Sequence, residues 1–135
     1  MKFGFTGTQR GMTPFQRQEV AEFLDHHRPE IAIHGGCIGA DEDFHRLCQE
    51  RKIPIRVHLP NNLSKTSKYV LADEKAVLVS RGRDYLQRNQ DIVDEASGLI
   101  ATPKEQNEVL RSGTWATIRR AKKAGKIVMI VPPSV

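Results

Sequence analysis

The chain has 135 residues, a formal net charge of +5 and two cysteines, a size that suits one domain with its own hydrophobic core. Two cysteines are too few for the disulfide framework of a small secreted protein, and no apolar run approaches the roughly 20 residues of a membrane span. The positive charge favours an anionic partner, and an aromatic content of 6% is too low for the base-stacking platform of a single-strand binder.

The first third of the chain predicts a strand, a helix and a second strand. Residues 1–5 lead into strand-like sequence without the apolar core of a signal peptide, so we expect a cytoplasmic protein. A loop over residues 6–12 follows. Residues 13–16 then combine a threonine N-cap, a proline at the first helical position and a glutamine that completes a capping box. The apolar character of residues 30–33 predicts a strand buried on both faces, as in a parallel sheet.

The middle of the chain is less regular. Residues 34–43 form a glycine turn that opens a second helix. Residues 53–59 predict a third strand, and Pro54 within it favours an edge position. Residues 69–80 fit a short helix and a strand equally well, and we assign no role to residues 61–82.

The last third returns to clear periodicity. A helix is predicted over residues 83–96 and a fourth strand over residues 98–102, followed by a polar loop. Residues 112–125 predict a final helix that Ser112 opens and a glycine ends. A fifth strand is predicted over residues 127–131.

Five strands separated by helices predict one domain over residues 1–135. The expected fold class is a three-layer α/β, Rossmann-like sandwich with a five-stranded parallel sheet in the order 3-2-1-4-5. In such a sheet the ligand binds beyond the carboxyl ends of the strands, where the strand order reverses. We therefore expect the loops at residues 6–12, 34–41 and 102–114 to meet at one site.

The glycine turn predicts an anion site. It runs His34-Gly35-Gly36-Cys37-Ile38-Gly39-Ala40-Asp41, and a strand that ends in glycines and opens a helix leaves N–H groups unpaired at the positive end of the helix dipole. Ser112-Gly113-Thr114 can offer N–H groups and a hydroxyl in the same way.

Two better-known glycine motifs are absent from the sequence. Neither Gly-x-Gly-x-x-Gly after the first strand nor Gly-x-x-x-x-Gly-Lys-Ser/Thr occurs. This argues against a dinucleotide oxidoreductase and a P-loop hydrolase.

Three motifs, in their order and spacing, resemble the SLOG superfamily of Rossmann-like proteins. They are Thr-Gly-Thr at residues 6–8, Gly-Gly-Cys-Ile-Gly-Ala-Asp at residues 35–41 and Ser-Gly-Thr-Trp-Ala-Thr at residues 112–117. The superfamily includes the LOG cytokinin-activating nucleotide hydrolases, the DNA-processing protein DprA and small YspA/YpsA-related domains. The small domains give the best resemblance, because residues 36–41 are similar to their Gly-x-x-Gly-Ala-Asp turn and residues 88–93 to their Arg-Asn-x-x-Ile-Val helix.

The resemblance implies a SLOG-like domain that binds a nucleotide, with phosphate held by the glycine loops and without a cofactor or metal. Arg10 and Arg88 suit phosphate through their planar guanidinium groups; the alternatives are a solvated side chain for Arg10 and an ion pair with Asp84 or Asp91 for Arg88. The residues expected to contact ligand or phosphate are Gly7, Thr8, Arg10, Gly35, Gly36, Gly39, Ala40, Asp41, Arg88, Asn89, Thr102, Ser112, Gly113 and Thr114.

Some members of the superfamily cleave the N-glycosidic bond between base and ribose phosphate. The LOG enzymes carry a catalytic glutamate in the last helix, and the matching position here is Thr117, which is not acidic. This departure favours binding without cleavage. If cleavage occurs, Asp41 and Asp43 are the candidate carboxylates, although Asp41 also suits a helix cap. Glu42 lies four residues before Arg46 and predicts a surface pair.

The set of His34, Cys37, Asp41 and His45 does not have the spacing of a zinc site, so packing roles are favoured. Cys37 is expected to fill space in the turn.

The sequence supports one leading hypothesis and two alternatives. The first is a domain that binds a nucleotide or nucleotide-derived small molecule as a sensor, carrier or sequestering protein. The alternatives are a nucleoside 5'-monophosphate N-glycosidase and a DprA-like DNA-binding protein that uses the basic cluster within residues 119–126. We expect copies of the domain to self-associate and expect no membrane partner.

Overall fold

Six strands, all parallel, form the sheet of the computed structural model, which describes residues 1–135. The strand order is β4-β3-β2-β1-β5-β6. The elements in chain order are β1 (Lys2–Gly7), α1 (Pro14–His26), β2 (Ile31–His34), α2 (Ala40–Glu50), β3 (Ile55–Leu59), α3 (Lys68–Leu71), β4 (Val77–Ser80), α4 (Tyr85–Glu95), β5 (Gly98–Thr102), α5 (Gly113–Lys123) and β6 (Ile127–Ile130).

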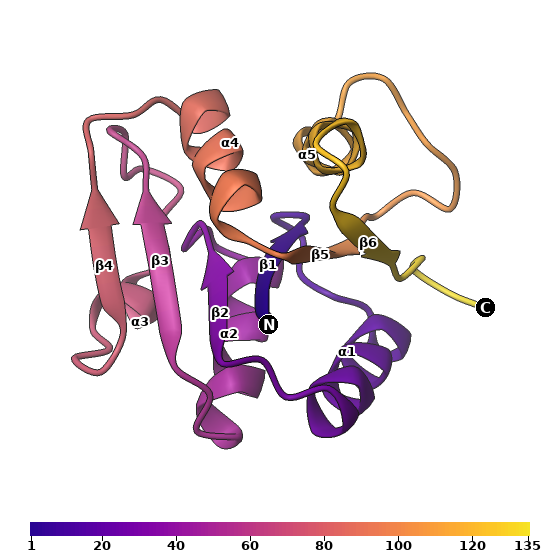
Figure 1. Cartoon of the computed structure of the whole chain (residues 1–135), viewed down its shortest axis with the longest axis horizontal. Helices are drawn as coiled ribbons and strands as arrows, with labels where there is room; N and C mark the ends of the chain where they lie inside the picture. The colour runs from indigo at the N-terminus through magenta and orange to yellow at the C-terminus, as the bar shows by residue number, and fades with distance from the viewer.

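The helices cover both faces of the sheet, which gives the predicted three-layer α/β architecture (Figure 1). On the face of α1 and α2, Phe5 stacks on Phe44 with ring centroids 4.3 Å apart. On the face of α4 and α5, Trp115 and Ile118 pack against Leu99. Both layers bury apolar side chains against the central strands, so both faces of the sheet are covered around β1.

The prediction of five strands is wrong, because β4 adds a sixth at the edge beside β3. The five predicted strands keep their relative order. Since β3 pairs with both β2 and β4, its prediction as an edge strand is also wrong. Pro54 precedes β3, and its carbonyl accepts a hydrogen bond from the N–H of Ala32 at 2.9 Å. A proline just before a strand costs no ladder bond.

Helix starts follow the predicted sequence signals, with one exception. Thr13 caps α1 in a complete capping box with Gln16, and Ser112 caps α5. At α2 the N-cap is Gly39, and Asp41 lies inside the first turn. The prediction that Asp41 caps α2 is therefore wrong.

The strand order reverses between β1 and β5, because α1 leads from β1 to β2 on one side while β5 joins the opposite side of β1. The loops after β1, β2 and β5 meet at the carboxyl edge, where ligands bind in folds of this kind. None of the five helices has the length and apolar character that crossing a membrane requires.

Candidate functional site

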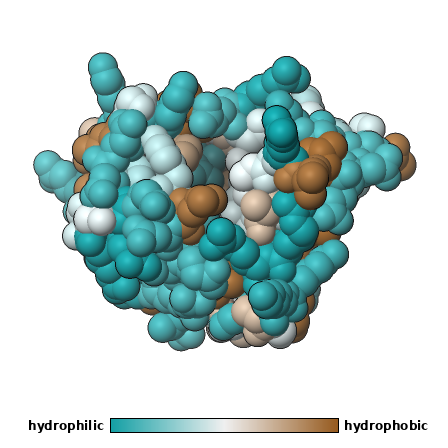
Figure 2. Space-filling model, turned by 90° about the horizontal axis from the view of Figure 1, so that it is seen from above, coloured by the Kyte–Doolittle hydropathy of each residue, from teal (hydrophilic) through white to brown (hydrophobic).

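A cavity of about 540 Å³ opens at this reversal point, between α4 and the start of α5. Figure 2 looks down on that edge of the molecule and shows a hollow in a mostly hydrophilic surface. The lining comes from the end of β1 and the loop after it, the glycine turn and the first turn of α2, α4, and the segment from residue 104 to residue 117. Its members are Phe5, Thr6, Gly7, Thr8, Gln9, Arg10, Gly35, Cys37, Asp41, Tyr85, Leu86, Arg88, Asn89, Ile92, Lys104, Glu105, Arg111, Ser112, Gly113, Thr114 and Thr117.

The cavity brings together ten of the fourteen residues predicted to contact ligand. They are Gly7, Thr8, Arg10, Gly35, Asp41, Arg88, Asn89, Ser112, Gly113 and Thr114. The other four, Gly36, Gly39, Ala40 and Thr102, are not part of the lining. The hydroxyl of Thr102 is buried without a hydrogen-bond partner.

The N–H groups of the glycine turn are already used by the chain itself. Gly36 donates to Nδ1 of His34 at 2.9 Å, and Cys37 donates to Oδ2 of Asp41 at 3.0 Å. The N–H groups of Ile38 and Ala40 donate to backbone carbonyls of residues 65 and 8, each at 2.9 Å. The expectation of several unpaired N–H groups is therefore wrong for these four residues.

The segment without an assigned role closes over this turn. Residue 66 forms a bridge with Cys37, and the N–H of Ser67 donates to the carbonyl of Gly36 at 2.8 Å. The hydroxyl of Ser67 also donates to Glu42 at 2.5 Å. Glu42 in turn pairs with Arg46 as predicted, at 3.4 Å. Residues 66 and 67 thus fix the shape of the glycine turn from outside.

Asp41 is the anion that the glycine turn holds. Its side chain is only 8% exposed, and it turns back from α2 to accept the N–H of Cys37. Burial raises the pKa of Asp41 to about 6, and the positive charge of Arg88 with the N–H groups of Cys37 and Gly35 opposes that rise. Near neutral pH the carboxylate is mostly ionised and occupies the position expected for a ligand anion.

Gly39 and Gly113 show two different uses of glycine. Gly39 has φ of +86°, and a Cβ there would lie 2.3 Å from the carbonyl oxygen of Gln9. Glycine is needed at this position because the loop after β1 passes close to the backbone of the glycine turn. At Gly113 a Cβ would meet nothing within 4 Å. The open side of the cavity is therefore at the start of α5.

The start of α5 has free donors and cations around it. The side chain of Ser112 accepts the N–H of Trp115 at 3.2 Å, and the first N–H groups of a helix have no acceptor within it, here those of Gly113 and Thr114. Arg10, Lys104 and Arg111 line the same cavity, are exposed, and make no ion pair within the chain. A helix start surrounded by free cations attracts an anionic group.

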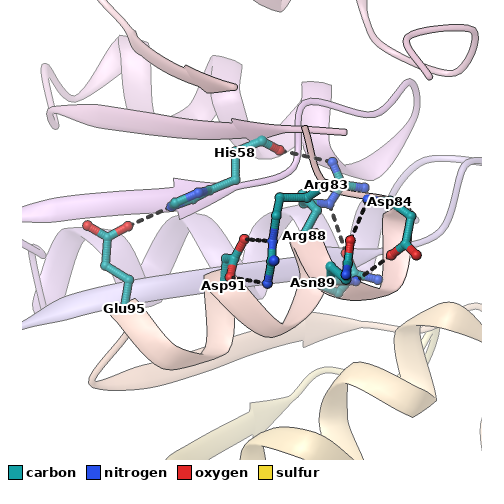
Figure 3. A network of polar contacts seen from close by, with 8 residues as sticks. His58, Arg83, Asp84, Arg88, Asn89, Asp91 and Glu95 are labelled. Atoms are coloured by element: carbon teal, nitrogen blue, oxygen red, sulfur yellow. Dashed lines mark hydrogen bonds and ion pairs between the residues drawn. The ribbon is translucent and has the colours of Figure 1, made fainter. Parts of the chain in front are cut away.

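Arg88 is a buried cation on the inward side of α4. It is 3% exposed, and its guanidinium donates to the carbonyls of Gly35 at 2.6 Å and His58 at 3.0 Å, and to Oδ1 of Asn89 at 3.0 Å. Figure 3 shows this network, in which the ring of His58 also contacts Glu95.

The predicted ion-pair alternatives for Arg88 are wrong. Asp84 caps α4 by accepting the N–H of Gln87 at 2.8 Å, and Asp91 pairs with Arg83 at 3.1 Å. Arg88 is thus a buried guanidinium without a carboxylate within ion-pair distance.

The carboxylates divide into those inside and those outside the cavity. Asp43 lies outside, where its oxygens bind the N–H of Met12 at 2.8 Å and Arg17 at 3.2 Å. Asp41 and Glu105 line the cavity, and Glu105 accepts the indole N–H of Trp115 at 3.1 Å. Asp43 therefore secures the loop after β1 and is not in reach of a ligand.

Thr117 lines the cavity, and its hydroxyl donates to the carbonyl of Gly113 at 2.9 Å. The hydroxyl of Thr117 therefore has its hydrogen-bond acceptor within α5. It offers no general acid or base at this wall.

Two buried histidines connect the glycine turn to Asp73. Nε2 of His34 lies 2.8 Å from Nδ1 of His45, whose Nε2 lies 2.8 Å from Asp73. Because His34 accepts the N–H of Gly36 on Nδ1, its proton is on Nε2. His34 therefore donates to Nδ1 of His45, and Nε2 of His45 donates to Asp73. No three histidine, cysteine or acidic side chains gather as metal ligands. Burial raises the pKa of Cys37 to about 11, so its thiol is protonated.

Several lining residues were not predicted from the sequence. Lys104, Glu105 and Arg111 lie in a loop whose position was predicted but whose individual residues carry no periodic signal. Tyr85 and Leu86 lie in a predicted helix but were themselves given no role at the site. Leu86 is 57% exposed at the cavity, whereas Arg88 of the same helix is 3% exposed.

Two solved structures share this fold. The molybdenum cofactor binding protein from the phototrophic bacterium Rippkaea orientalis aligns with a TM-score of 0.73 at 18% identity, over 97% of this chain and 76% of that chain. TM1055, a structural genomics target, aligns with a TM-score of 0.67 at 20% identity, over 94% of this chain and 71% of that chain. No protein-family model matches the chain, and no curated protein matches it. At these identities the chain is similar to both proteins in fold.

Proposed function

We propose that the chain binds a nucleotide or nucleotide-derived small molecule in the cavity, as a sensor, carrier or sequestering protein. The observation that carries this proposal is the open start of α5 at Gly113, with three unpaired cations around it. The anionic group of the ligand binds there, and the rest of the ligand extends past β1 towards α4. A cavity of about 540 Å³ is large enough for one such molecule.

The fold neighbours are compatible with this proposal. The Rippkaea orientalis protein is described as binding a cofactor, which is a small molecule. The resemblance of the three loops to the SLOG superfamily supports a nucleotide-related ligand for this chain.

Binding without cleavage is favoured by the chemistry of Thr117, which lines the cavity and carries no acidic group. Its hydroxyl is bonded to Gly113, and no carboxylate replaces the glutamate of the LOG enzymes. One observation favours cleavage: Asp41 is a buried carboxylate in the cavity with a pKa raised to about 6. An N-glycosidase that uses Asp41 is therefore the second candidate.

DNA binding has less support. Of the basic cluster on α5, Arg119 pairs with Glu108 at 2.7 Å and Arg120 donates to Gln90 at 3.1 Å. Two of the cations are thus engaged within the chain, and the remaining ones form an ordinary exposed helix face.

The test is incubation of the purified protein with nucleoside mono-, di- and triphosphates, followed by desalting and reversed-phase HPLC. We expect the wild-type protein to retain one nucleotide class and to release no free base. Release of base that stops in the Asp41→Asn variant would support the N-glycosidase instead. If the protein neither retains a nucleotide nor releases a free base, both candidates are contradicted.

A further inference from the structure

Two ends of the cavity differ in what they offer a ligand. The glycine turn follows β2 and the start of α5 follows β5, so the two lie on opposite sides of β1. The α5 end presents unused N–H groups and free cations. The glycine-turn end presents the carboxylate of Asp41, with Arg88 and Asn89 beside it.

We propose that the Asp41 end of the cavity binds a pair of neighbouring hydroxyl groups, as on a ribose ring, and excludes the anionic group of the ligand. This inference rests on the proposed function, because it specifies which part of the ligand lies at which end. Asp41 then determines specificity by accepting hydroxyl protons.

The geometry of the turn supports the exclusion. The N–H of Cys37, which would cradle a phosphate, already donates to Oδ2 of Asp41. A phosphate placed there would have to displace the carboxylate of Asp41, which is also negatively charged and is buried in the first turn of α2. Like charges at such a distance repel strongly where water is scarce.

The same groups suit hydroxyls. An ionised carboxylate has about four acceptor positions, and the N–H groups of Cys37 and Gly35 use two of them. Asp41 can therefore accept the protons of two adjacent hydroxyl groups, as carboxylates do in dinucleotide-binding folds.

Asn89 and Arg88 supply the complementary donors. The Oδ1 of Asn89 accepts the Nε proton of Arg88 at 3.0 Å, which orients the amide and leaves its NH2 group without a partner in the chain. Nη2 of Arg88 reaches only the sulfur of Cys37, at 3.5 Å, so one of its two protons remains available. Asn89 and Arg88 can donate to the oxygens of a diol, and the neighbouring carboxylate of Asp41 can accept its two hydroxyl protons.

The experiment is calorimetric titration of the wild-type protein with the four common ribonucleoside 5'-monophosphates and their 2'-deoxy counterparts. The matched variants are Asp41→Asn and Asp94→Asn. Asp94 is an exposed acid on α4 outside the cavity, so its replacement removes the same charge without touching the site. Circular dichroism establishes that each variant is folded.

We expect the wild type and Asp94→Asn to prefer the ribose form of the bound nucleotide at least tenfold, and Asp41→Asn to reduce that preference to threefold or less. Equal affinity for ribose and deoxyribose forms in the wild type would overturn this inference and leave the proposed function standing. A preference that persists in a folded Asp41→Asn variant would also overturn it. Absence of binding by every nucleotide would overturn the proposed function together with this inference. If Asp41→Asn does not fold, the wild-type comparison decides alone.

Discussion

The guanidinium of Arg88 fills the space in which a side chain at Gly35 would lie. A Cβ at residue 35 would be 2.6 Å from Cζ of Arg88, and Nη1 of the same arginine donates to the Gly35 carbonyl at 2.6 Å. The glycine of the turn and the arginine of α4 therefore depend on each other. Together they connect the two helical layers through the carboxyl end of β2.

Arg88→Met should destabilise the protein strongly. The change leaves the buried carbonyls of Gly35 and His58 without their donor, and we expect the free energy of unfolding to fall by about 2–4 kcal/mol. The control is Arg83→Met, which removes a more exposed pair with Asp91 and should cost at most about 1 kcal/mol. Urea unfolding measures both, and equal losses in the two variants would contradict the structural role of Arg88.

Gly39→Ala and Gly113→Ala should differ sharply in stability. At Gly39 the positive φ and the contact with the Gln9 carbonyl oppose any side chain, so we expect a loss of about 3 kcal/mol or more. At Gly113 the space is open and the backbone is helical, so we expect a change within about 1 kcal/mol, towards higher stability. Thermal unfolding measures the pair. A tolerated alanine at residue 39 would show that the loop after β1 does not cross the turn as described.

Stability should fall as the pH drops from 7.5 to 6. Burial lowers the pKa values of His34 and His45 below that of a free histidine, so the unfolded chain takes up protons below about pH 6.5 while the folded chain does not. Asp41, whose pKa is raised to about 6, acts in the opposite direction and mainly below pH 6. The chosen window therefore reports mostly on histidines.

His45→Gln is the variant that tests this pH dependence. Glutamine can accept from His34 and donate to Asp73, but it does not titrate. Urea unfolding at several pH values should give a shallower pH dependence for the variant than for the wild type. An identical slope in the two proteins would contradict the neutral state of the buried histidine pair.

Gly113→Asp should weaken nucleotide binding without unfolding the chain. The new side chain has room, and its charge lies where the proposal puts the ligand anion, so we expect the affinity to fall by a factor of about 10 or more. Asn107→Asp adds the same charge in an exposed part of the same loop, outside the cavity lining. Equilibrium dialysis compares the two variants, and unchanged affinity in Gly113→Asp would place the anion elsewhere.

The strand order around β1 and the meeting of three loops could be predicted from the sequence, because apolar runs and helix caps such as Thr13 and Ser112 are local signals. The strand β4 could not. Val77–Ser80 is four residues long and largely exposed, and its state as a strand depends on pairing with β3.

The chemistry of the site was harder to predict than its position. Glycines after a strand indicate a turn, but the sequence does not reveal that Asp41 folds back into it, since that contact depends on how α2 packs. The inward side of α4 was also hard to predict, because one of its buried residues is the charged Arg88. Cations in an irregular loop, such as Lys104 and Arg111, have no periodic pattern that could assign them to the cavity.

The most direct test of anion binding at the start of α5 is a titration of ¹⁵N-labelled protein with the nucleotide that it retains, followed by two-dimensional amide NMR. We expect the largest shifts on the N–H groups of Gly113 and Thr114, with smaller changes at Gly36 and Cys37, whose N–H groups are engaged within the chain. Largest shifts at Gly36 and Cys37, with Gly113 unmoved, would contradict this expectation and return the anion to the glycine turn.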